Sequence, residues 1–135
     1  MMLVPIPRQG LADTSAVWGP FVESIAKRGR CHLQQRLNDV YTGLVQPVVV
    51  WDEVAKAAKA LVGLMTMVRG DDQISRIVWL AGKDRHQWVG LNDELENYCR
   101  SLGSSGMEAI ARPGWGPELK KLGYRLTHVQ YEKDF

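Results

Sequence analysis

The segment from Gly82 to Gly90 carries the residues best suited to binding an anion. Its sequence is Gly-Lys-Asp-Arg-His-Gln-Trp-Val-Gly, and Lys83, Arg85 and His86 come just before an expected helix. Backbone N–H groups and the partial positive charge at a helix N-terminus favour phosphate, and basic side chains strengthen this preference. The alternative is a solvated basic turn that holds no ligand.

Hydrophobic periodicity predicts the helices around this segment. Apolar residues recur at helical spacing from Trp18 to Ile25 and from Leu33 to Leu44, which predicts two N-terminal helices. Pro20 is expected in the first turn of the first helix, where its missing N–H is tolerated. Two more helices are predicted from Leu91 to Leu102 and from Trp115 to Leu122, ended by Gly103 and Gly123 respectively.

Five apolar runs predict strands: Val48–Trp51, Ala60–Val68, Ile74–Leu80, Met107–Ala111 and Arg125–Glu132. The second run is apolar on both faces, so it and the third are expected at the centre of the sheet. The order then predicts one α/β (α+β) domain over residues 1–135. Its mixed sheet has an antiparallel front and a parallel crossover behind, with flanking helices.

Composition excludes several function classes. Seventeen Lys and Arg against fifteen Asp and Glu give a net charge of +2, which does not predict nucleic-acid binding. No apolar run is long enough for a membrane span, and prolines break the N-terminal apolar run, so no signal peptide is expected. Cys31 and Cys99 are expected to be reduced thiols, with a reactive Cys31 as the alternative. Three scattered histidines predict no metal site.

Two of the five tryptophans differ from the others in their context. Trp88 and Trp115 adjoin glycine or proline turns at helix starts, so they are candidate anchors of a protein interface. The alternative is packing, with Trp88 covering the start of its helix. The other three lie on predicted strands or on the apolar stripe of the first helix, which indicates the core.

The element order and the end of the chain resemble a known superfamily. A short helix followed by Gly-Tyr and a last strand is similar to the GNAT N-acetyltransferases. The pattern Ala111-Arg112-x-Gly114-Trp115-x-x-x-Leu119-x-x-x-Gly123-Tyr124, ending in Glu132-Lys133-Asp134, resembles the small GNAT-like proteins of tailed bacteriophages. The resemblance implies a GNAT-like fold over the whole chain.

The superfamily binds acyl-CoA through a pyrophosphate loop, Arg/Gln-x-x-Gly-x-Gly/Ala, before a helix. At that position the chain has Gly82 and Gly90 eight residues apart, with bulky residues between them, and the pattern is not found in that register. Lys83, Arg85 and His86 remain weak candidates for cofactor binding together with the two glycines.

The resemblance also implies a carboxylate base and a tyrosine acid. Glu108 and Tyr124 are the weak catalytic candidates. Tyr131 and His128 lie further along the chain, and a histidine in an exposed strand is the simpler interpretation of the latter.

Two functions follow from these observations. The first is a non-catalytic bacteriophage protein, a virion-associated structural or protein-binding component with no cofactor. Its partners are other phage or host proteins, possibly in a repeated assembly, in the virion or the host cytoplasm. The second is an acyl-CoA-dependent N-acetyltransferase with an atypical loop and acetyl-CoA as its cofactor. The loop favours the first, and whether the protein is an enzyme stays open.

Overall fold

A single mixed sheet organises the described part of the chain, residues 1–83, 86 and 89–135 of a computed structural model. Its strands lie in the order of the sequence: β1 (Met2–Pro5), β2 (Gln46–Asp52), β3 (Ala57–Arg69), β4 (Asp72–Gly82) and β5 (Gly106–Ala109). The first four pair antiparallel, and β5 pairs parallel with β4. The crossover from β4 to β5 contains a helix, as parallel pairing requires.

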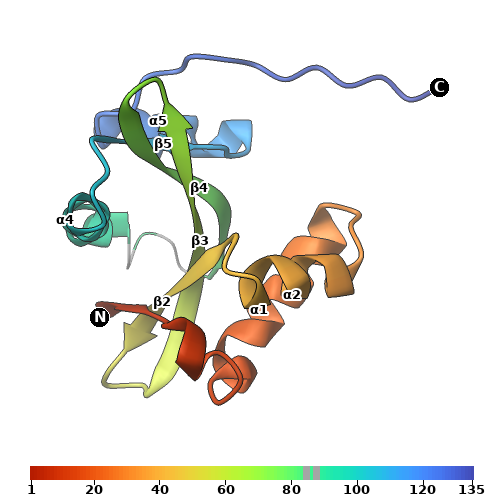
Figure 1. The fold of residues 1–135 in the computed structure, drawn as a ribbon, viewed down its shortest axis with the longest axis vertical. Helices are drawn as coiled ribbons and strands as arrows, with labels where there is room; N and C mark the ends of the chain where they lie inside the picture. The colour runs from red at the N-terminus through yellow and green to blue at the C-terminus, as the bar shows by residue number, and fades with distance from the viewer. Residues whose placement is uncertain (84–85, 87–88) are drawn as a thin grey trace.

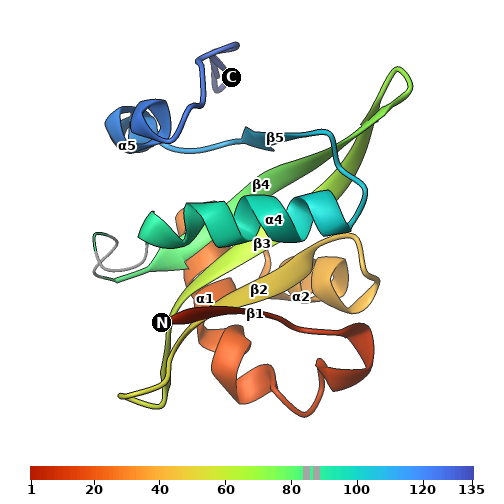
Figure 2. The same ribbon diagram turned by 90° about the vertical axis from the view of Figure 1, so that its left-hand side faces the viewer.

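Helices cover both faces of this sheet (Figures 1 and 2). On one face lie α1 (Ser15–Arg28) and α2 (Leu33–Tyr41), and on the other lie α4 (Asn92–Ser101) and α5 (Gly116–Lys121). Short 3₁₀ turns, η1 (Arg8–Gly10), η2 (Val89–Leu91) and η3 (Pro113–Trp115), precede helices. The fold is therefore a sheet between two helical layers, as the sequence predicts.

The two faces of β3 carry separate parts of the core. Leu61 packs with Trp18 from α1 on one face, and Val62 packs with Leu95 and Cys99 from α4 on the other. Adjacent strand residues point to opposite faces, so the doubly apolar run buries both sets. This confirms the prediction that β3 and β4 are the central strands.

A bulge in β4 changes which residues face each layer. Gly63 pairs with Trp79 whereas Leu64 pairs with Ile77, so Val78 is an extra residue in β4. The bulge lets Ile77 and Leu80 face the α4 side although they are three residues apart.

Two predictions about strands are corrected at the ends of the chain. The first strand, β1, was not predicted because prolines interrupt its pattern, yet it lies at the sheet edge, where proline is tolerated. The predicted last strand, Arg125–Glu132, is absent, and these residues follow an extended path outside the sheet. Alternation of side chains marks a segment able to pair but does not supply its partner.

The position of Pro20 is also corrected. It lies in the second turn of α1, which begins at Ser15, rather than in the first turn. Pro20 is exposed, and it removes one backbone hydrogen bond from α1. The burial of Trp18, Val22 and Ala26 on one stripe keeps the helix intact across this position.

Candidate functional site

The candidate site lies where β4 and β5 separate. Their pairing runs from Ile74 opposite Gly106 to Ile77 opposite Ala109, and the N–H of Ile110 donates to the carbonyl of Ile77 at 3.1 Å. Beyond this point β4 continues to Gly82, whereas the other chain turns into η3. Among the described residues, this end of β4 has no strand partner on its β5 side.

An apolar pocket opens beside this separation on the α4 face. It encloses about 520 Å³, part of it open to solvent, within the range of small-molecule sites. Its floor comes from the sheet, one wall from α4 and the other from α5. Residues that line it include Val50, Val62, Leu80, Leu95, Leu119 and Tyr124. Such a lining suits a flexible chain with few charges.

The η3 turn and α5 form the outer wall of the pocket. Trp115 is half-buried there, lines the pocket and packs against the cluster of Val50 and Ala60. Its role as an interface anchor stays a prediction. The other interface candidate, Trp88, lies outside the described residues.

Tyr124 places one hydroxyl in this apolar wall. Gly123 ends α5 with a φ of +92°, which favours glycine, and the Tyr124 N–H then donates to the Leu119 carbonyl at 3.0 Å. The phenol hydroxyl donates to the Met107 sulfur at 3.7 Å. Burial, and then the charge of Glu96, raises the pKa of Tyr124 to about 12. Tyr124 therefore keeps its proton at neutral pH.

The raised pKa of Tyr124 predicts how stability depends on alkaline pH. An unfolded tyrosine loses its proton near pH 10 and Tyr124 near pH 12, so its contribution to folding is complete below pH 10 and is lost as the pH rises toward 12. Urea unfolding measured across this window should show a smaller loss of stability for Tyr124→Phe than for the parent. Tyr131→Phe, which removes an exposed phenol, should behave as the parent. Identical slopes for all three proteins would contradict the prediction.

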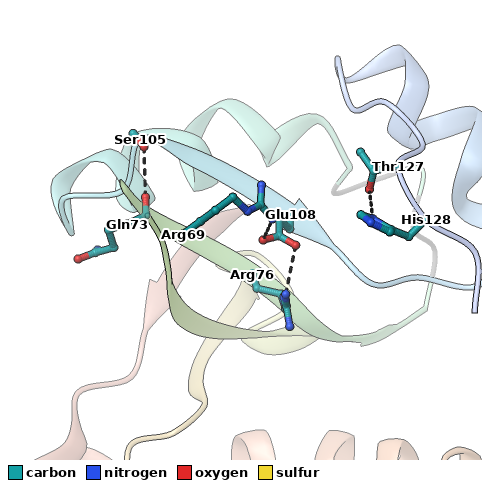
Figure 3. A network of polar contacts seen from close by, with 7 residues as sticks. All are labelled: Arg69, Gln73, Arg76, Ser105, Glu108, Thr127 and His128. Atoms are coloured by element: carbon teal, nitrogen blue, oxygen red, sulfur yellow. Dashed lines mark hydrogen bonds and ion pairs between the residues drawn. The ribbon is translucent and has the colours of Figure 1, made fainter. Parts of the chain in front are cut away.

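Glu108 lies on the opposite face of β5 from Met107, because neighbouring strand residues alternate. Its carboxylate forms ion pairs with Arg69 and with Arg76, the latter at 3.3 Å between Arg76 Nη2 and Glu108 Oε2 (Figure 3). The two catalytic candidates, Glu108 and Tyr124, are thus brought to the same strand but to its two faces.

The residues of the predicted anion segment are placed only in part. Gly82 pairs with Ala60 in β3, and a Cβ on Gly82 would lie 2.5 Å from the Ala60 Cβ, so this glycine serves strand packing. Lys83 is exposed, and its N–H donates to the Lys59 carbonyl at 3.3 Å. His86 is exposed, and Arg85 lies outside the described residues.

Gly90 lies in η2, directly before α4. It is exposed, and a Cβ there would have no atom within 4 Å, so neither backbone strain nor packing within the described chain demands glycine. The first turn of α4 has no side-chain cap and contains Asp93 and Glu94. These carboxylates suit the helix dipole but oppose an anion, so a phosphate here would depend on backbone N–H groups and on basic side chains.

The start of α4 shows a register of the phosphate-loop pattern that the spacing of Gly82 and Gly90 conceals. Counted from Gln87, the sequence reads Gln87-x-x-Gly90-x-Asn92, which matches the first and fourth positions of Arg/Gln-x-x-Gly-x-Gly/Ala. Asn92 replaces the small sixth residue and is the first residue of α4. The signal that would have found it is alignment of the pattern to the expected helix start.

The remaining titratable candidates lie away from the pocket. His128 and Tyr131 are exposed on the C-terminal segment, and the His128 Nδ1 is 2.9 Å from the Thr127 hydroxyl oxygen (Figure 3). Cys31 is exposed and Cys99 is buried, and both are free thiols. In the described residues, His, Cys, Asp and Glu form no group of three that could hold a metal ion.

Comparison of the sequence with protein-family models and with curated proteins gave no significant match. Solved structures do match. A probable acetyltransferase superposes with a TM-score of 0.73 at 9% identity, covering 100% of this chain and 98% of that one. A ribosomal-protein-alanine N-acetyltransferase from Brucella melitensis biovar Abortus 2308 gives 0.70 at 10% identity, with both chains fully covered.

The chain has the GNAT acetyltransferase fold. A predicted acetyltransferase from Clostridium acetobutylicum, solved with acetyl-CoA, has a TM-score of 0.65 at 10% identity, covering 98% of this chain and 95% of that one. The GNAT-like fold expected from the sequence is confirmed. Neither the structure nor the comparisons lend support to a bacteriophage origin. None of the helices in the described ranges has the length and apolar character that would let it cross a bilayer.

Proposed function

We propose that the protein is an acyl-CoA-dependent N-acetyltransferase. The observation that carries this proposal is the apolar pocket at the separation of β4 and β5, with the protonated Tyr124 hydroxyl in its wall. Similar structures across the whole length of the chain are acetyltransferases, and one was solved with acetyl-CoA. Together they favour acyl transfer over a purely structural role.

The residues around the separation suit the parts of acyl-CoA. The pocket lining offers apolar contact to the acyl group and the thiol-bearing arm, and the unpaired edge of β4 beyond Ile77 offers backbone groups to the amides of that arm. The N-terminus of α4, with Gly90 before it, faces no side-chain cap and can take a phosphate. Bound acyl-CoA supplies an activated acyl thioester.

Tyr124 and Glu108 take different roles in this proposal. Tyr124 is positioned to give its proton to the leaving sulfur, because it is protonated at neutral pH and lies in the pocket wall. An acceptor amine would approach from the opposite face, where Glu108 is the carboxylate closest along β5. Arg69 and Arg76 already occupy that carboxylate, so an amine must compete with two guanidinium groups to transfer a proton to it.

The non-catalytic virion component is not retained as the preferred function. It rested on the missing pyrophosphate loop, and the register that begins at Gln87 weakens that reason. No contact or surface described above favours a virion role over acyl transfer.

Calorimetric titration with acetyl-CoA tests the proposal. We expect a dissociation constant of about 10 μM or tighter, roughly −7 kcal/mol. Gly90→Glu should weaken binding by at least about tenfold, because a carboxylate would face the phosphates near the start of α4. Gly19→Glu is the matched control, since Gly19 lies in α1 on the other face and a Cβ there also has open space.

Two results would reject this function. One is the absence of binding by the folded parent protein at millimolar acetyl-CoA. The other is equal weakening by Gly90→Glu and Gly19→Glu, which would mean that added charge rather than position causes the effect. Circular dichroism of both variants checks that the fold is intact.

A further inference from the structure

The last eleven residues, 125–135, form an extended segment that we name the C-terminal arm. In the described structure, the last backbone hydrogen bond toward the C-terminus is from Tyr124 to Leu119, and none joins the arm to the body. The arm runs away from α5 and β5, on the side of the sheet that carries α1 and α2 (Figure 1). It is therefore a projecting strand-like segment with no partner in the described part of its own copy.

The side chains of the arm are those of a strand with an apolar face. Leu126 is 85% exposed and Tyr131 is 89% exposed, and Val129 and Phe135 are exposed as well. Alternation places Thr127, Val129 and Tyr131 on one face, and polar residues such as Gln130 on the other. Large apolar side chains held in water on an extended segment indicate an interaction surface.

The sheet offers one edge that matches this arm. β5 is the last strand of the sheet, and its outer edge has no partner among the described residues. Met107 and Ala109 on one face of β5 pack against the apolar cluster under α4, and Glu108 lies on the other face. The opposite edge, β1, contains Pro5, which has no N–H to donate.

We infer that the C-terminal arm pairs as a strand with the free edge of β5 in a second copy of this chain, and that two copies exchange arms. Each copy carries one arm and one edge, so the exchange closes at two copies with a two-fold axis. Val129 and Tyr131 then extend the apolar face of Met107 and Ala109. His128 lies on the face of Glu108, where a polar pair is favourable. The inference does not depend on acyl transfer.

Sedimentation velocity of the full chain over a wide concentration range measures this association. We expect a dimer that dissociates on dilution. Adjacent residues of a strand direct their N–H groups to opposite sides, so Val129→Pro and Gln130→Pro form a matched pair. One of them removes an N–H that bonds to β5, and the other removes an N–H that faces solvent.

The expected result is that one proline variant weakens dimerisation by at least about tenfold while the other stays near the parent. Both variants should keep the parent's circular dichroism, because the arm has no backbone contact with the body. Equal effects of the two prolines, or a full chain that stays monomeric at the highest concentration, would overturn the inference. Protection of the arm from hydrogen exchange in a monomer would instead assign it to its own β5.

Discussion

Replacing Trp18 by alanine is expected to lower the free energy of unfolding by about 3–5 kcal/mol. Trp18 is fully buried between α1 and the sheet. Its indole N–H donates to the Leu11 carbonyl at 3.1 Å, and its ring meets Tyr41 edge-on with centroids 5.6 Å apart. The side chain thus joins the segment before α1, α1 itself and α2, and its loss leaves a cavity shared by all three. Urea unfolding measures the change.

A conservative variant separates packing from hydrogen bonding at this position. Trp18→Phe keeps an aromatic ring but leaves the Leu11 carbonyl without its donor, and should cost roughly 1–3 kcal/mol. Leu126→Ala removes a side chain in water and should change stability by less than about 0.5 kcal/mol. A loss for Trp18→Ala no larger than that of Leu126→Ala would show that this residue does not support the core.

Tyr124→Phe is expected to lower the rate of acyl transfer by about 10²–10⁴-fold, the usual contribution of a general acid. The phenylalanine keeps the ring that lines the pocket, so the Michaelis constant for acetyl-CoA should change little. The assay follows thiol release from acetyl-CoA with an amino acid amide as the acceptor. This expectation rests on the proposed function.

The matched control for this experiment is Tyr131→Phe. Tyr131 lies on the exposed arm, away from the pocket, and should keep the parent's turnover. If Tyr124→Phe lowers acetyl-CoA affinity and turnover together, the hydroxyl has a structural role. If it changes neither, the acid is another group or the solvent.

Much of the fold was predictable because its signals are local. The doubly apolar run in β3 and the helical stripe of α4 each need one segment only, and both are confirmed. β1 was missed because prolines suppress the strand pattern at an edge, where they are tolerated. The last strand was wrong because pairing requires a partner that no local pattern specifies.

The candidate site was predictable only in its parts. Gly-Tyr at the end of α5 pointed to Tyr124, but its contact with Met107 arises from the crossover between distant elements. The pairing of Glu108 with Arg69 and Arg76 depends on the register of three strands, which no spacing in the sequence expresses. Gly82 was assigned to the anion segment because its close approach to Ala60 was not visible in the sequence.

The order in which the chain is made bears on the pocket. Leu3 from β1 and Trp115 from η3, which are far apart in the sequence, both pack on the cluster of Val50 and Ala60 and line the pocket. During synthesis the sheet of β1 to β4 can therefore form while the pocket still lacks its outer wall. Binding competence should arise late in folding, after α5 docks, and a ligand in the pocket would hold together the earliest and latest parts of the chain.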